Sequence, residues 1–162
     1  MPLDIQSSKD LEFHTICSFL STHCKSEKAK ENALKINFFE NTDSLERELN
    51  LLQEIKLIHE DDKISFPHPS SEDIDHALKI LRVENGVLIL AEVIKVYNLC
   101  IGTKQLIDFA IRQKAESPLI FDACAHIDQI DNVLLLIRAV LDEKKLIIKD
   151  DATPFLKQVR ES

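Results

Sequence analysis

Glycine is scarce in this sequence, with only 2 among the 162 residues, whereas average usage is about 7%. Phosphate-binding loops and dinucleotide-binding fingerprints need several closely spaced glycines, because the backbone there approaches a phosphate or takes a positive φ. Gly86 and Gly102 are too far apart to form either motif. β-Sandwiches and barrels also use glycine in their tight turns. The shortage argues against a nucleotide site in this chain and favours a helical fold.

Long apolar runs are also missing. Val87–Ala91 and Val133–Ile137 are far shorter than the roughly eighteen apolar residues of a membrane span. The cysteines lack the close spacing of a metal site, and no secretory leader is recognised, so reduced and mostly buried thiols are expected. They are Cys17, Cys24, Cys100 and Cys124. We therefore expect a cytoplasmic protein without a membrane span.

The charge is acidic, because 28 Asp and Glu residues outnumber 20 Lys and Arg residues and give a net charge of −8. Most of the surplus lies in the first half of the chain. Nucleic-acid backbones are bound by clustered Lys and Arg. The surface of this chain is therefore expected to repel nucleic acid.

Apolar residues recur at helical spacing along most of the chain. The clearest helix is expected from Asp43 to Ile58, where Asp43 and Glu46 have the spacing of a capping box. Further helices are expected at about 11–24, 26–34, 71–81, 88–114, 121–126 and 131–141. Ser71 and Asp131 are expected to cap two of them, and a last helix is expected to start at Thr153–Pro154.

The sequence therefore predicts an all-α fold, a multi-helix bundle in a single domain over residues 1–162. At most a short hairpin is expected, near residues 146–151. Apolar side chains on the inner faces of the helices should form the core. The positions expected there are Leu45, Leu49, Leu52, Ile55, Ile94, Ile101, Leu134 and Ile137.

Two clusters of side chains have the composition of a metal site. His14 and Cys17 share a helix with His23 and Cys24, but no second pair has ligand spacing, so we interpret them as ordinary helical residues. The second cluster is Asp122, His126, Asp128 and Asp131. A helical metallophosphohydrolase would need a histidine followed by aspartate, and none of the six histidines precedes one. A solvated helix end is therefore favoured over a ligand set.

The nearest approach to a basic patch is a group of three lysines, Lys144, Lys145 and Lys149. Acidic residues surround them and no aromatic residues are interleaved, so a solvated turn is favoured over a phosphate site. No nucleophile motif is present either. We expect no catalytic residue, no metal and no cofactor in this chain.

Several short segments follow one another in an order known from one protein family. They are Leu11-Glu12-Phe13, the basic helix Ser26–Ala33, the helix Asp43–Ile58, Phe66-Pro67-His68-Pro69, Asp73-Ile74, Ala77-Leu78, Gly86-Val87-Leu88 and the stretch from Ile147 to Arg160. In this order they resemble the N-terminal region of bacterial MutS-II proteins, the MutS paralogues that lack the mismatch-reading domain. The chain departs from the family where Ser65-Phe66 and Asn85 replace glycines, which indicates a divergent relative.

The resemblance implies that the chain is the first part of a helical core, or lever, domain. In such proteins this domain connects a DNA-embracing arm to a C-terminal ATPase that binds ATP and Mg²⁺ and dimerises. The partners of the full-length homodimer would be DNA, in mismatch repair or recombination control, or a stalled ribosome. The arm helix would begin at about residue 153, and Lys157 and Arg160 are the residues expected near nucleic acid.

The last expected helix has no cap before Ser162, so we expect the chain to be a piece of a longer protein. The alternative is a free-standing helical module for protein interaction or dimerisation. A glycine-rich nucleotide-binding loop encoded after residue 162 would support the MutS-like interpretation, whereas a stop codon there would defeat it.

Overall fold

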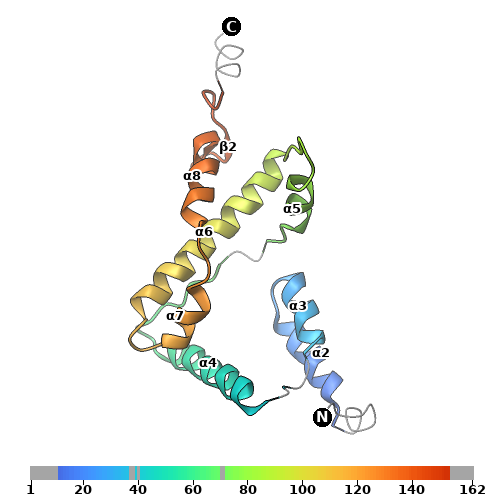
Figure 1. Ribbon diagram of the computed structural model, residues 1–162, viewed down its shortest axis with the longest axis vertical. Helices are drawn as coiled ribbons and strands as arrows, with labels where there is room; N and C mark the ends of the chain where they lie inside the picture. The colour runs from blue at the N-terminus through green and yellow to red at the C-terminus, as the bar shows by residue number, and fades with distance from the viewer. Residues whose placement is uncertain (1–10, 37–38, 40, 70–71, 154–162) are drawn as a thin grey trace. The chain divides into compact units, whose positions relative to one another are not determined.

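The computed structural model of the chain describes residues 11–36, 39, 41–69 and 72–153 (Figure 1). Most of these residues are helical, and a single two-stranded hairpin is the only sheet among them, as the all-α prediction expects. Although the sequence is interpreted as one domain, contacts divide the chain into two compact units. Unit 1 is Met1–Ser65 and unit 2 is Phe66–Ser162, and each is described by itself.

Unit 1 contains the helices α2 (Phe13–His23), α3 (Glu27–Leu34) and α4 (Thr42–Glu60). Helices α2 and α3 pack against each other (Figure 1). Ser26 caps α3 by accepting a hydrogen bond from the Ala29 amide at 3.1 Å, which satisfies a backbone donor that the first helical turn cannot pair. Each of the two helices also contributes a buried residue, Cys17 and Ala33 respectively.

Helix α4 begins earlier than the sequence predicts. The residue that caps it is Asn41, whose Oδ1 accepts from the Ser44 amide at 2.7 Å, and Asp43 lies within the first turn. A capping box was expected at Asp43, but an asparagine two residues upstream has an equally suitable side chain. An acidic residue in the first turn still suits the helix dipole.

The predicted core positions on α4 are not buried. Leu45, Leu49, Leu52 and Ile55 are 39%, 54%, 59% and 37% exposed, whereas Ile58 is only 4% exposed. The prediction that these four side chains pack in a core is wrong for this structure. Helical periodicity identifies an apolar face, but it does not say which surface, if any, covers that face.

Unit 2 is built around α6 (Leu90–Arg112). The shorter helices α5 (Asp75–Leu81), α7 (Pro118–Cys124) and α8 (Ile130–Val140) all contact it (Figure 1). Leu134 of α8 is 2% exposed, so its predicted place in the core is confirmed. Ile94, Ile101 and Ile137 are half-buried. The other buried hydrophobic residues are Ala77, Cys100, Phe109, Ala110, Ile120, Cys124 and Leu141.

The predicted helix caps in unit 2 need correction. Asp131 does not cap α8, because the N-cap is Gln129, in the left-handed region at φ 63°. Asp131 instead pairs with Lys104 of α6, with its Oδ2 3.1 Å from the Lys104 Nζ. The other expected cap, Ser71, lies outside the described residues. At α5, Asp73 Oδ1 accepts from the Asp75 amide at 2.8 Å.

The hairpin consists of β1 (Leu141–Asp142) and β2 (Ile147–Ile148), which pair antiparallel with Leu141 opposite Ile148. The short hairpin predicted near residues 146–151 is present, but its first strand lies upstream of the predicted range, at Leu141–Asp142. The predicted arm helix from about 153 lies outside the described residues apart from Thr153. None of the described helices has the length and apolarity needed to span a membrane.

Candidate functional site

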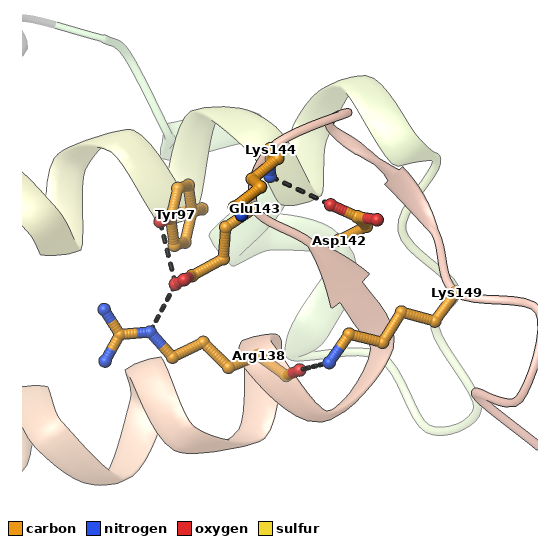
Figure 2. Close-up of polar contacts among 6 residues, drawn as sticks. All are labelled: Tyr97, Arg138, Asp142, Glu143, Lys144 and Lys149. Atoms are coloured by element: carbon orange, nitrogen blue, oxygen red, sulfur yellow. Dashed lines mark hydrogen bonds and ion pairs between the residues drawn. The ribbon is translucent and has the colours of Figure 1, made fainter.

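A set of polar contacts between elements distant in sequence joins the hairpin to helices α6 and α8 (Figure 2). We call it the hairpin junction, formed by Tyr97, Arg138, Asp142, Glu143 and Lys149. Tyr97 lies in α6 and Arg138 in the last turn of α8. Asp142 ends β1, Glu143 follows it in the turn, and Lys149 follows β2. The junction thus brings together three elements immediately before the chain reaches residue 153.

Glu143 is the centre of the hairpin junction. Its Oε1 accepts a hydrogen bond from the Tyr97 hydroxyl at 2.9 Å, and the same oxygen accepts from Arg138 Nε (Figure 2). Because Arg138 and Glu143 are both charged, the hydrogen bond between them is stronger than one between neutral groups. One carboxylate therefore ties the turn of the hairpin to α6 and to the end of α8.

Lys149 fastens the other strand of the hairpin to α8. Its Nζ donates to the Arg138 carbonyl at 2.6 Å, and its amide donates to the Val140 carbonyl at 2.9 Å. The Arg138 carbonyl is among the last of α8, where helical partners are missing and a lysine is a favourable neighbour. Leu141, the first residue of β1, is fully buried. The hairpin is thus attached through backbone, side chains and core.

The turn itself is held by Asp142. Its Oδ1 accepts from the amides of Lys144 and Lys145 at 2.9 and 3.1 Å, and its carbonyl accepts from the Leu146 amide at 2.8 Å. Leu146 takes a φ of 53°, in the left-handed region that leucine seldom adopts. The network around Asp142 fixes this conformation, which leads the chain from the turn into β2.

The electrostatics of the hairpin junction favour the charged form of both carboxylates. Hydrogen bonds from Arg138 and then from Tyr97 lower the pKa of Glu143 below its usual 4.5. The pKa of Asp142 is lowered mainly by the amides of Lys145 and Lys144. Partial burial raises the pKa of Tyr97, and the hydrogen bond to Glu143 raises it further. The phenol therefore stays protonated and able to donate at neutral pH.

The stability of the hairpin junction should depend on pH and should fall under acidic conditions. A carboxylate whose pKa is lower in the folded state stabilises it fully above the unfolded pKa, and this contribution is lost as the pH falls through the folded pKa. For Glu143 the loss should begin near its ordinary pKa of 4.5 and continue below it. We expect Glu143→Gln to be less stable than the wild type at neutral pH and to lose less stability on acidification.

This pH dependence can be measured by urea unfolding between about pH 7 and pH 3, followed by the fluorescence of Tyr97, the only tyrosine. The stabilities of wild type and Glu143→Gln should converge at the acid end, because protonation removes from the wild type what the substitution removes from the variant. Parallel curves that never converge would contradict the assigned role of Glu143.

The side chains of the hairpin junction connect elements that are distant in the sequence. Its side chains are engaged with one another and with the backbone, and among the described residues no group of three or more His, Cys, Asp or Glu side chains could hold a metal ion. What the junction can do is fix the direction in which the chain leaves α8 and the hairpin.

The other predicted sites have the following places in the structure. Lys157 and Arg160, the residues expected near nucleic acid, lie outside the described residues. Asp122, His126 and Asp128 are exposed. His14 Nδ1 lies 3.3 Å from the Ser18 hydroxyl, and the ring of His23 lies edge-on to Phe19 at 4.8 Å. All four cysteines are free thiols, and only Cys24 is not buried.

Sequence reasoning missed the hairpin junction. Tyr97 and Glu143 are 46 residues apart, and no local spacing connects them. The sequence predicts a solvated turn at Lys144, Lys145 and Lys149. The structure has a turn here, in which the amides of Lys144 and Lys145 donate to Asp142. The contact of the Lys149 Nζ with the Arg138 carbonyl could not be predicted from the sequence. The signal available in the sequence was the single tyrosine on the helix that carries the longest apolar stripe.

The comparisons with known proteins leave the family open. No family model, no curated protein and no solved structure matches the chain.

Proposed function

We propose that this chain is the non-catalytic helical core, or lever, region of a MutS-like ATPase that acts in DNA mismatch repair or recombination control. In this proposal, movement driven by ATP and Mg²⁺ in a C-terminal ATPase domain is relayed to a DNA-binding clamp. The full-length protein would be a cytoplasmic homodimer with DNA, or the ribosome, as its partner. The order of motifs along the sequence supports the family, and the hairpin junction supports the mechanical role.

The hairpin junction is the single observation that carries the lever. A lever must pass a displacement from one end to the other without bending at a joint. Here the long helix α6, the end of α8 and the hairpin are tied by one carboxylate, Glu143. Lys149 attaches the outgoing strand to α8. The proposed arm would continue directly from this fixed point.

The DNA-binding part of the proposal is tested by the double variant Lys157→Glu and Arg160→Glu in the protein encoded by the complete reading frame. If both residues contact phosphates, their loss should weaken DNA binding and reduce the slope of log affinity against log salt by about 1 to 2 units. The measurement is a DNA titration at several salt concentrations. DNA affinity that stays unchanged at low salt would count against the placement of the arm.

A second function has one observation in its favour. Many large apolar side chains are exposed, among them Phe19 at 67%, Val87 at 81% and Leu135 at 70%. Exposed apolar patches mark sites of protein contact. This suits a free-standing helical interaction or dimerisation module, and it equally suits a core region covered by the rest of a larger protein. DNA-stimulated ATP hydrolysis by the complete protein would decide for the first proposal, and its absence for the second.

A further inference from the structure

Helix α4 carries an exposed apolar stripe that has no partner in the structure as described. Leu45, Leu49 and Leu52 are 39%, 54% and 59% exposed. Their spacings of four and three residues place them within an arc of about 60° on an α-helix. We call these three residues the leucine seam. Their spacing is that of the a and d positions of a coiled coil, which pack against a partner helix.

The leucine seam is separate from the side on which α4 is covered. Leu51, Glu54 and Ile58 are the residues of α4 that are not exposed. By helical geometry they also fall within about 60° of one another, and they lie on the other side of the helix from the seam. The helix thus has one covered side and a second, uncovered apolar stripe. Exposure of the apolar side chains of Leu45, Leu49 and Leu52 to water is unfavourable in free energy. A partner surface that covers them is therefore expected.

The charges around the leucine seam define the chemistry of that partner. Glu46 and Glu48 flank the seam, at positions that contact the flanking residues of a partner helix in a coiled coil. Over its whole length α4 has five acidic and two basic residues. One of the two basic residues, Lys56, already has Glu60 at 3.7 Å. A second α4 docked on the seam would bring its own Glu46 and Glu48 to the same flanking positions and would place like charges opposite one another.

We propose that the leucine seam of α4 is a docking surface for an amphipathic helix of another protein, with an apolar stripe flanked by lysine or arginine. The leucines supply the buried contact, and Glu46 and Glu48 select a basic partner over an acidic one. This inference holds for either function proposed above, because it concerns only one face of α4. Its test uses neither ATP nor DNA, so its failure is distinguishable from theirs.

The test uses two synthetic helical peptides of equal length, with leucine at every a and d position. One has lysine and the other has glutamate at all e and g positions. Binding to the 162-residue chain is followed by fluorescence anisotropy of a label on the peptide. We expect the lysine peptide to bind at least tenfold more tightly than the glutamate peptide. Salt should weaken its binding, since exposed charge pairs are screened.

Variants of the chain separate docking on the seam from general attraction to an acidic protein. Leu49→Asp should weaken binding of the lysine peptide at least tenfold. The control is Leu57→Asp, because Leu57 is 56% exposed on the same helix but outside the seam, and its substitution adds the same charge. Leu57→Asp should leave the affinity within about twofold. Circular dichroism of both variants checks that the helices are retained.

Three results would overturn the proposal. The first is equal binding of the two peptides, and the second is an equal effect of the two aspartate variants. The third is a stable dimer of the chain in sedimentation that Leu49→Asp dissociates, because a second copy would then occupy the seam. Exchange of Glu46 and Glu48 for lysine gives an independent check, since it should reverse the preference between the peptides.

Discussion

Gly86→Ala is expected to destabilise unit 2 by about 2–4 kcal/mol, a loss typical of severe steric strain. A Cβ at this position would lie 2.1 Å from the Ile80 carbonyl oxygen and 3.0 Å from that of Val83. Both neighbours are backbone atoms, so no side-chain rotation can make room. The turn between α5 and α6 would have to open, and the hydrogen bond from the Gly86 amide to the Val83 carbonyl would be disturbed.

The measurement for Gly86→Ala is the free energy of unfolding in urea, followed through Tyr97 fluorescence. The matched control is Asn85→Gly. Asn85 has a φ of 61°, a conformation that both asparagine and glycine tolerate, so the change should be within about 0.5 kcal/mol. If Gly86→Ala were as mild as its neighbour, the close approach of the backbone at this turn would be disproved.

Leu134→Ala is the second substitution with a large expected effect. Leu134 is 2% exposed in the helix that packs on α6, so truncation leaves a cavity and should cost about 2–5 kcal/mol. Leu135 is the adjacent residue and is 70% exposed. Leu135→Ala removes the same atoms and should change the stability by less than about 1 kcal/mol. The pair therefore tests which face of α8 is buried.

Both variants of α8 are compared by the same urea titration, with the slope of the transition as a check on cooperativity. Equal losses at the two positions would mean that α8 packs through both faces. A larger loss at Leu135 would place the inward face of α8 on the wrong side and would contradict the packing described for unit 2.

The helices of this chain could be predicted well because helix formation leaves a local signature. Apolar residues three and four apart, together with polar caps, indicated α4, α6 and α8 to within a few residues at their ends. The caps were less certain, because neighbouring side chains compete for the same backbone donors. Asn41 caps α4 in place of Asp43, and Asp131 pairs with Lys104 instead of capping α8.

What covers a helix could not be predicted from periodicity. The apolar stripe of α4 looks like that of a core helix, yet Leu49 and Leu52 are exposed, whereas Leu134 in the equally regular stripe of α8 is buried. The difference depends on which other surface meets the stripe, and that is a property of tertiary contacts. The hairpin junction was missed for the same reason, because Tyr97, Arg138 and Glu143 meet only after α6 and α8 have packed.

The proposed lever role of the hairpin junction is tested most directly by the nucleotide dependence of DNA affinity in the complete protein. We expect ATP to change the affinity of the wild-type protein for DNA by at least fivefold, as is usual for coupled sites. Glu143→Ala should bring that ratio close to one, while ATP hydrolysis without DNA stays within about twofold of the wild type. Lys144→Ala is the control, since its side chain lies on the same turn and only its amide contacts Asp142.

The contradicting result is equally definite. If Glu143→Ala and Lys144→Ala both retained the wild-type ratio of DNA affinities with and without ATP, the hairpin junction would not transmit movement. The lever proposal would then fail even if the protein hydrolysed ATP and bound DNA.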